Sequence, residues 1–228
     1  MVMMVDDPSL RLGGRDAARA LADDGAPPLR IAQVAPLYES VPPKLYGGTE
    51  RVVSWLTERL VRMGHQVTLY ASGDSRTAAQ LVAGWPCGLR LADPPVTDEV
   101  PHLLQLEQLW RRRHAFDVLH FHSGPMHFAW ARRCGVPSLT TLHGRLDLPE
   151  LRPLVHEYPE QPLVSISDAQ RRPLPEARWE ATIHHGMPLE PSPFCAEPGT
   201  YLAFLGRISP EKRCDRAIEI ARRAGLPL

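Results

Sequence analysis

The chain has 228 residues, 43% of them hydrophobic and 23% charged, as is typical of a globular protein. Its 26 basic and 26 acidic residues balance, so the bulk charge gives no reason to expect nucleic acid or an anionic membrane as a partner. The four cysteines are widely spaced without a C-x-x-C pair, and no apolar run is long enough for a membrane span, which predicts a cytoplasmic protein with reduced thiols and no transmembrane segment.

The N-terminal segment is interpreted as an extension that precedes the folded part. Residues 1–28 carry acidic residues early and lack the long apolar stretch of a signal peptide. We expect 1–28 to be disordered, apart from a short helix near residues 15–21. The folded part begins at residue 29 with "LRIAQVAPL", a short apolar run that is typical of a buried parallel strand.

A helix is predicted directly after two adjacent glycines, Gly47 and Gly48. Thr49 is placed to cap this helix, and Glu50 lies in its first turn, where a carboxylate is favourable. Apolar residues at helical spacing continue to Gly64, which ends the helix, and "QVTLYA" follows as the next strand. Strand, helix and strand in this order predict a right-handed βαβ unit.

The alternation of strand and helix continues to residue 186. The first of the later helices is expected to begin at Pro101, and further strands are predicted within 117–122, 138–144, 162–167 and 179–186. We therefore expect residues 29–186 to form an α/β domain with a doubly wound, Rossmann-like parallel sheet. In such sheets ligands bind at the carboxyl ends of the strands.

A second unit is predicted after a linker. Residues 187–200 contain four prolines and show no periodicity, as is typical of an interdomain linker. Residues 201–228 then read as an apolar strand, "YLAFLG", followed by a loop and the helix "CDRAIEIARRAGL". One strand and one helix cannot bury their own apolar faces, so we interpret 201–228 as the first strand–helix unit of an incomplete, truncated domain.

Two strand-to-helix junctions have the residues of a phosphate site. Glycine admits close approach of another molecule to the backbone, and the start of the helix after Gly47 and Gly48 supplies free N–H groups and a positive dipole end. Arg207 and Lys212 flank the second junction, where two cations suit a diphosphate. A tight connection and two solvated cations are the alternative interpretations. No G-x-G-x-x-G follows the first strand, which argues against an NAD-dependent dehydrogenase.

Several of the ten histidines lie at predicted strand ends. His120 and His122 share one face of a strand, yet no cysteine or acid stands at a zinc-site spacing, so we predict no metal site. His143 ends a strand and precedes a glycine; it reads either as a functional residue at the rim of the sheet or as a packed, hydrogen-bonded histidine. Ser167 also follows a strand, and no G-x-S-x-G elbow marks a serine nucleophile.

Five motifs in order resemble the family-4 glycosyltransferases over residues 29–228. They are "RIAQVAPLYESVPPKLYGGTERVVSWLTERLVRMGHQVTLYASGDS", "TLHG", "LVSISDAQ", "IHHGM" and "FLGRISPEK". The resemblance implies the GT-B architecture, in which two Rossmann-like domains enclose a nucleotide sugar. The region 29–186 would be the N-terminal acceptor-side domain and 201–228 the start of the donor-binding domain. The chain departs from the family in Gly144 and His185, where the family has Asp and Asn, and it lacks the rest of the second domain with its paired glutamates.

The resemblance also implies an activity, which is the transfer of a hexose from a nucleoside-diphosphate sugar to an acceptor with retention of anomeric configuration. No cofactor and no metal are implied. Gly47, Gly48, Arg207 and Lys212 would hold the donor diphosphate, and His143 would be the catalytic residue beside the transferred sugar. Contacts to the acceptor or sugar would come from Glu50, His122 and Ser167.

Two alternatives stay open at this point. One is a non-catalytic truncated remnant, and we expect the 228-residue chain itself to be inactive because it lacks most of the donor-binding domain. The other is a nucleotide-sugar epimerase of the same architecture. The residues do not distinguish a sugar, a lipid or a small molecule as the acceptor, and they leave self-association through the incomplete domain open.

Overall fold

The computed structural model describes residues 27–188 and 196–228. The chain divides into two compact units, Met1–Met187 and Pro188–Leu228, which we describe separately. Almost all of the predicted extension at 1–28, including the helix expected near 15–21, lies outside the described residues.

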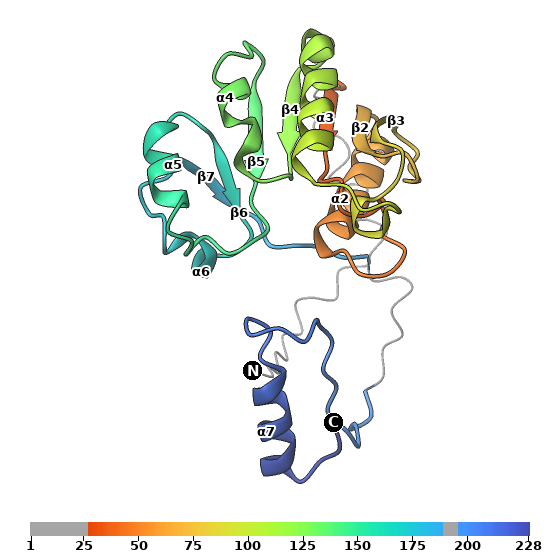
Figure 1. The fold of residues 1–228 in the computed structure, drawn as a ribbon, viewed down its shortest axis with the longest axis vertical. Coiled ribbons are helices and arrows are strands. Elements are labelled where there is room, and N and C mark those ends of the chain that lie inside the picture. The colour runs from red at the N-terminus through yellow and green to blue at the C-terminus, as the bar shows by residue number, and fades with distance from the viewer. Residues whose placement is uncertain (1–26, 189–195) are drawn as a thin grey trace. The chain divides into compact units, whose positions relative to one another are not determined.

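The first unit is built on a seven-stranded, all-parallel sheet (Figure 1). Its strands, in the order β3-β2-β1-β4-β5-β6-β7, are β1 (Arg30–Val34), β2 (Gln66–Ser72), β3 (Gln80–Trp85), β4 (Val118–Phe121), β5 (Ser138–Thr141), β6 (Leu163–Ser165) and β7 (Trp179–Thr182). The chain runs outward from β1 in one direction, returns to β4 beside β1 and then continues in the other direction. This is the Rossmann-type order, and it confirms the predicted doubly wound parallel sheet.

The two faces of the sheet are covered by different helices. On one face, Leu106 of α3 (Glu99–Arg112) packs in a cluster with Tyr70 of β2. On the other face, Val53 of α2 (Gly48–Arg62) packs with Leu69 and Ala71 of β2. Because neighbouring residues of a strand point to opposite sides of the sheet, α2 and α3 lie on opposite faces.

The remaining helices that the structure describes in this unit are short and connect the later strands. A third apolar cluster, which includes Phe128, Val155 and Leu163, packs the first two of them against that end of the sheet. These helices are α4 (Phe128–Ala131), α5 (Leu151–Glu157) and α6 (Asp168–Arg171), with 3₁₀ turns at Leu89–Leu91, Arg113–Ala115 and Pro125–His127.

Two predicted helix starts need correction. Helix α2 begins at Gly48 with Gly47 as its N-cap and without a side-chain cap, so Thr49 lies inside the first turn. Helix α3 begins at Glu99, two residues before Pro101. Proline lacks only an N–H that has no intrahelical partner in the first turn, which is why the helix can start before it.

In its described residues, the second unit contains one helix, α7 (Cys214–Ala224), which Gly225 ends in the left-handed conformation with a φ of 65°. Residues 201–206, predicted as a strand, form no strand in the described part of this unit. Instead the Leu202 N–H donates to the Pro227 carbonyl oxygen at 2.8 Å. A strand needs neighbouring strands to pair its backbone, and residues 196–228 contain none.

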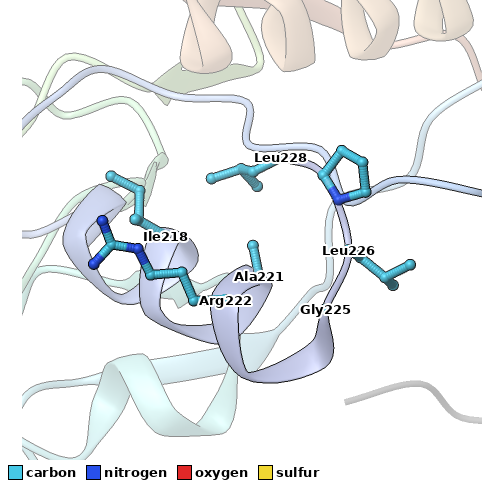
Figure 2. A pocket seen from close by; sticks show the side chains of 7 residues that line it. Ile218, Ala221, Arg222, Gly225, Leu226 and Leu228 are labelled. Carbon is cyan, nitrogen blue, oxygen red and sulfur yellow. The ribbon is translucent and has the colours of Figure 1, made fainter.

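One face of α7 turns toward the end of the chain. Ile218 and Ala221 lie on this face, as their spacing predicts, and Figure 2 shows them around a hollow that Leu226 and Leu228 also line. None of the helices in the described ranges is both long and apolar enough to cross a membrane.

Candidate active site

The sequence-predicted site residues of the first unit gather at one edge of the sheet. His122 directly follows β4, His143 follows β5 and Ser167 follows β6, while Gly48 begins the helix after β1. All strands are parallel, so their carboxyl ends share this edge, which we call the carboxyl rim. The backbone N–H of His122 donates to the Val34 carbonyl oxygen at 2.9 Å, so the end of β4 lies beside the end of β1.

The two glycines before α2 differ in what surrounds them. Gly47 is buried, and a Cβ at this position would lie 2.7 Å from Pro43 Cβ. Its φ of 167° is extended backbone, so close packing against Pro43 requires the glycine, not an unusual conformation. Gly48 is exposed, and a Cβ there would meet no atom within 4 Å. The main chain at Gly48 is therefore open to a ligand, whereas the main chain at Gly47 is not.

The start of α2 presents backbone donors that no N-cap side chain occupies. No side-chain hydrogen bond caps the helix, and the first intrahelical bond runs from the Arg51 N–H to the Gly47 carbonyl oxygen. The N–H groups of Gly48 and Thr49 thus have no partner within the helix, whereas the N–H of Glu50 bonds to its own carboxyl group. Together with the dipole of a 15-residue helix, they favour an anion at this point.

Glu50 lies behind this turn and not on its surface. Its side chain is buried, and burial raises the pKa of its carboxyl group, against the effects of backbone N–H groups and of Arg90. Arg90 also pairs with the buried Glu39 at 3.0 Å between Nη1 and Oε1. Glu50 is thus placed to support the glycine turn from inside the loop.

A connected row of polar side chains leads from the interior of the sheet to the carboxyl rim; we call it the histidine chain. His122 Nδ1 lies 2.9 Å from His143 Nε2, and His143 Nδ1 lies 3.3 Å from His185 Nε2. On the inner side, Gln33 contacts His122 Nε2 through Oε1 at 2.8 Å and His120 Nδ1 through Nε2 at 3.3 Å. His120 Nε2 then reaches the Thr141 hydroxyl at 2.8 Å.

Burial keeps these histidines neutral. Desolvation lowers the pKa of His120 to about 4 and, with the neighbouring imidazoles, lowers that of His143 to about 3. It also holds the pKa of His122 well below its usual value and lowers that of His185. His143 is therefore a packed, hydrogen-bonded and neutral side chain that also belongs to the rim. Across the described residues, no three His, Cys, Asp or Glu side chains converge as metal ligands would.

Ser167 is the N-cap of α6. Its Oγ accepts from the Gln170 N–H at 3.1 Å, and Gln170 Oε1 accepts from the Ile166 N–H at 2.8 Å. Gln170 Nε2 in turn donates to the carbonyl oxygens of Leu142 at 2.9 Å and Gly144 at 2.8 Å, on either side of His143. Gln170 thus holds the segment that carries His143.

Sequence reasoning missed Gln170 and Gln33, although each had a signal. Ser167 and Gln170 stand at the S-x-x-Q spacing of a capping box. Gln33 is a polar residue inside an otherwise apolar strand, and a buried amide needs partners. Both signals indicate that a side chain is hydrogen-bonded, but neither says to what.

Arg207 and Lys212 belong to the second unit. Arg207 Nη2 pairs with Glu211 Oε1 at 3.0 Å, and both cations lie on the exposed segment before α7. A Cβ at Gly206 would lie 3.8 Å from Lys212 Cγ, so the lysine stem runs beside this glycine. The structure thus places both cations on one short turn.

Comparisons with known proteins fit this architecture. The sequence profile described as Glycosyltransferase Family 4 matches residues 46–196, and no curated protein sequence matches the chain. Among solved structures, AviGT4, a glycosyltransferase involved in avilamycin A biosynthesis, matches with a TM-score of 0.54 and 24% identity over 87% of this chain and 55% of its own. A glycosyltransferase from Rickettsia africae ESF-5 matches with a TM-score of 0.47 and 14% identity over 89% of this chain and 51% of its own.

These matches carry different weight. The likeness to AviGT4 supports the fold, and the chain spans about half the length of both solved structures. The family profile covers well over half of the chain, including α2 and the strands from β2 to β7. With a doubly wound parallel sheet of the kind found in GT-B glycosyltransferases, the chain belongs to glycosyltransferase family 4.

Proposed function

We propose that this chain supplies the acceptor-side half of the cleft of a retaining, metal-independent glycosyltransferase that uses a nucleoside-diphosphate sugar. One observation carries the proposal: the open, uncapped start of α2 at Gly48 shares the carboxyl rim with the neutral histidine His143. An anion-binding turn and an uncharged polar side chain at the same edge suit a ligand with a diphosphate at one end and a sugar at the other.

The start of α2 would bind the donor diphosphate. Breaking the glycosidic bond builds negative charge on the leaving phosphate oxygen, and fixed backbone donors stabilise such charge without rearrangement. Arg207 and Lys212 would add positive charge from the second unit, the arginine through two parallel N–H donors and the lysine as a mobile point charge.

His143 would contact the sugar as a neutral group. Because its pKa is about 3, it carries no positive charge that would oppose an oxocarbenium-like transition state. The burial of Glu50 and His122 supports a role behind the surface, Glu50 under the glycine turn and His122 behind His143. Ser167 would act mainly by holding α6 and, through Gln170, the segment around His143.

Replacing Gly48 by valine tests the diphosphate role. A Cβ at Gly48 meets no protein atom within 4 Å, so Gly48→Val should fold normally while it blocks close approach of phosphate to the main chain. Binding of UDP, ADP and GDP to the 228-residue protein is followed by ligand-observed NMR. We expect the nucleotide that binds to lose affinity by about tenfold or more, which corresponds to about 1.4 kcal/mol.

The control is Met63→Val, which introduces the same residue at the exposed far end of the same helix. It should leave nucleotide affinity unchanged. Gly47→Val is unsuitable, because its side chain would collide with Pro43 and disturb the loop. Equal nucleotide affinity in Gly48→Val and the wild type would rule out the proposed phosphate contact.

A further inference from the structure

Gln33 is a fully buried amide in the middle of β1, and both ends of its side chain contact histidines of β4 or its end. These two strands are neighbours at the point where the strand order reverses. Burying an amide is costly unless its donor and acceptor are both used, and here both are. This double contact determines where the protons of the histidine chain lie.

The proton order toward the rim follows from the chemistry of each atom. The carbonyl oxygen of Gln33 can only accept, so His122 Nε2 must carry the proton across their 2.8 Å contact. A neutral imidazole has one N–H, so His122 Nδ1 is an acceptor, and His143 Nε2 must donate to it at 2.9 Å. His143 Nδ1 is then left with a lone pair, which accepts from His185 Nε2 at 3.3 Å.

The other end of the Gln33 amide orders the inner histidine. Its NH₂ group can only donate, so His120 Nδ1 accepts and His120 Nε2 carries the proton that reaches the Thr141 hydroxyl. The four histidines of the chain, which are His120, His122, His143 and His185, therefore have the same tautomer, with the proton on Nε2. A single amide imposes this order, because its two ends have opposite hydrogen-bonding roles.

We propose that Gln33 is a positioning residue that sets the tautomer of His143 through His122, so that His143 presents an unprotonated Nδ1 at the carboxyl rim. That Nδ1 is the acceptor for a hydroxyl group of the substrate, a part of the inference that rests on the proposed function. His185 occupies this acceptor in the free protein. It is an exposed residue, and its contact with His143 is longer than the contact between His143 and His122, so a hydroxyl can displace it.

The tautomers are measured directly by NMR of the 228-residue protein labelled with ¹⁵N-histidine at pH 7, without nucleotide or sugar. Protonated and unprotonated imidazole nitrogens resonate in well-separated ranges, and single replacements of histidines by glutamine assign the signals. We expect Nε2 of His120, His122 and His143 in the protonated range and Nδ1 of each in the unprotonated range. A protonated Nδ1 at His122 or His143 would overturn the proposal.

Gln33→Met then removes both hydrogen-bonding ends with little change in volume. We expect the signals of His122 and His143 to shift toward averaged values, because neither tautomer is now imposed. The matched control is Gln105→Met, which removes another buried amide, one that donates to the Ala35 carbonyl oxygen and not to a histidine. Signals of His122 and His143 that stay in place in Gln33→Met would contradict a role of Gln33.

Gln33→Glu keeps the proposal falsifiable if Gln33→Met fails to fold. The new carboxyl group, ionised or protonated, still offers an acceptor oxygen to His122 Nε2, so the tautomer of His143 should persist. Loss of the Nε2–H tautomer at His143 in this variant would contradict the proposal. These NMR measurements contain no nucleotide sugar, so their outcome is independent of the nucleotide-binding experiment. If nucleotide binding fails while the tautomers are ordered, only the proposed function is refuted.

Discussion

At the scale of single residues, two adjacent glycines serve different purposes. Gly47 must be a glycine because Pro43 occupies the space that a side chain at this position would need. Gly48 has open space beside it and no left-handed backbone that would require glycine. Stability therefore explains the first glycine, and contact with a ligand is the explanation that we propose for the second.

Buried histidines make stability depend on pH, which gives a prediction at this scale. Burial lowers the pKa of His120 to about 4 and of His127 and His143 to about 3, whereas all three titrate near 6.5 in an unfolded chain. Between these values the unfolded state binds more protons, so stability is present above pH 6.5 and falls as the pH is lowered. The slope is up to about 1.4 kcal/mol per pH unit for each histidine.

Urea unfolding at pH 7 and pH 5 measures this slope. We expect a lower free energy of unfolding at pH 5 in the wild type and a smaller difference between the two pH values in His143→Gln, which has one titrating group less. Gln105→Met, which loses no titrating group, should retain the full difference. The explanation is wrong if His143→Gln retains the whole pH dependence of the wild type.

At the scale of elements, the short helix α6 acts as a support for the strand end beside it. Ser167 caps the helix, and Gln170 reaches across to the carbonyl oxygens of Leu142 and Gly144. A four-residue helix is not stable alone, so the Ser167 cap and the Gln170 contacts to the β5 end are mutually dependent. The position of His143 therefore depends on a helix that does not contain it.

Replacing Gln170 by alanine should loosen the segment around His143. The variant leaves the two carbonyl oxygens without the amide donor, at about 1 kcal/mol for each hydrogen bond lost. Hydrogen exchange at residues 142–146 should become faster, including that of the Leu142 N–H, which donates to the Val164 carbonyl oxygen in β6. Arg172→Ala, at the exposed end of the same helix, should leave exchange unchanged. Unaltered protection in Gln170→Ala would show that the clamp is dispensable.

The sequence predicts the edge strand β7 as well as the interior strands, but it misses the other edge strand, β3. Strand β2 is buried over its whole length after Gln66, and as far as Ala71 its residues are β-branched, apolar or aromatic. Strand β3 (Gln80–Trp85) was not predicted, because this edge strand is half-exposed and contains an Ala-Gly step that weakens the pattern. At 201–206, in contrast, the apolar run predicts a strand that does not form, because the described part of this unit has no neighbouring strand to pair with it.

The candidate site shows the same division. Sequence position alone brings His122, His143 and Ser167 to the carboxyl rim, since each follows a parallel strand. It does not predict that Gln33 joins two strands or that Gln170 holds the His143 segment, because both depend on which strands become neighbours. The roles proposed for Arg207 and Lys212 rest on the family resemblance.

At the scale of the whole molecule, the described second unit has one helix and no strand. AviGT4, which shares this fold, is nearly twice as long as the part of it that this chain matches. Catalysis in a two-domain cleft depends on positioning, which can supply about 7–11 kcal/mol of assistance. An isolated turn with Arg207 and Lys212 supplies little of it.

We therefore expect the 228-residue polypeptide to show no measurable sugar transfer by itself. Purified protein is incubated with UDP-, ADP- and GDP-sugars, and release of nucleoside diphosphate is measured with and without simple sugar acceptors. Gly48→Val serves as the background control, because any residual rate shared with it does not come from the proposed site. Robust turnover in the wild type that Gly48→Val abolishes would show that these residues suffice for catalysis.

The uniform proton order of the histidine chain has an electrostatic direction. Every N–H bond from His185 through His143 and His122 points toward Gln33, so the bond dipoles add, and each polarises the next. The row therefore has a net dipole, with its negative end toward the carboxyl rim and its positive end toward the interior of the sheet. A sugar that becomes cationic at the rim would meet a favourable potential there, although no ionised side chain of the row provides it.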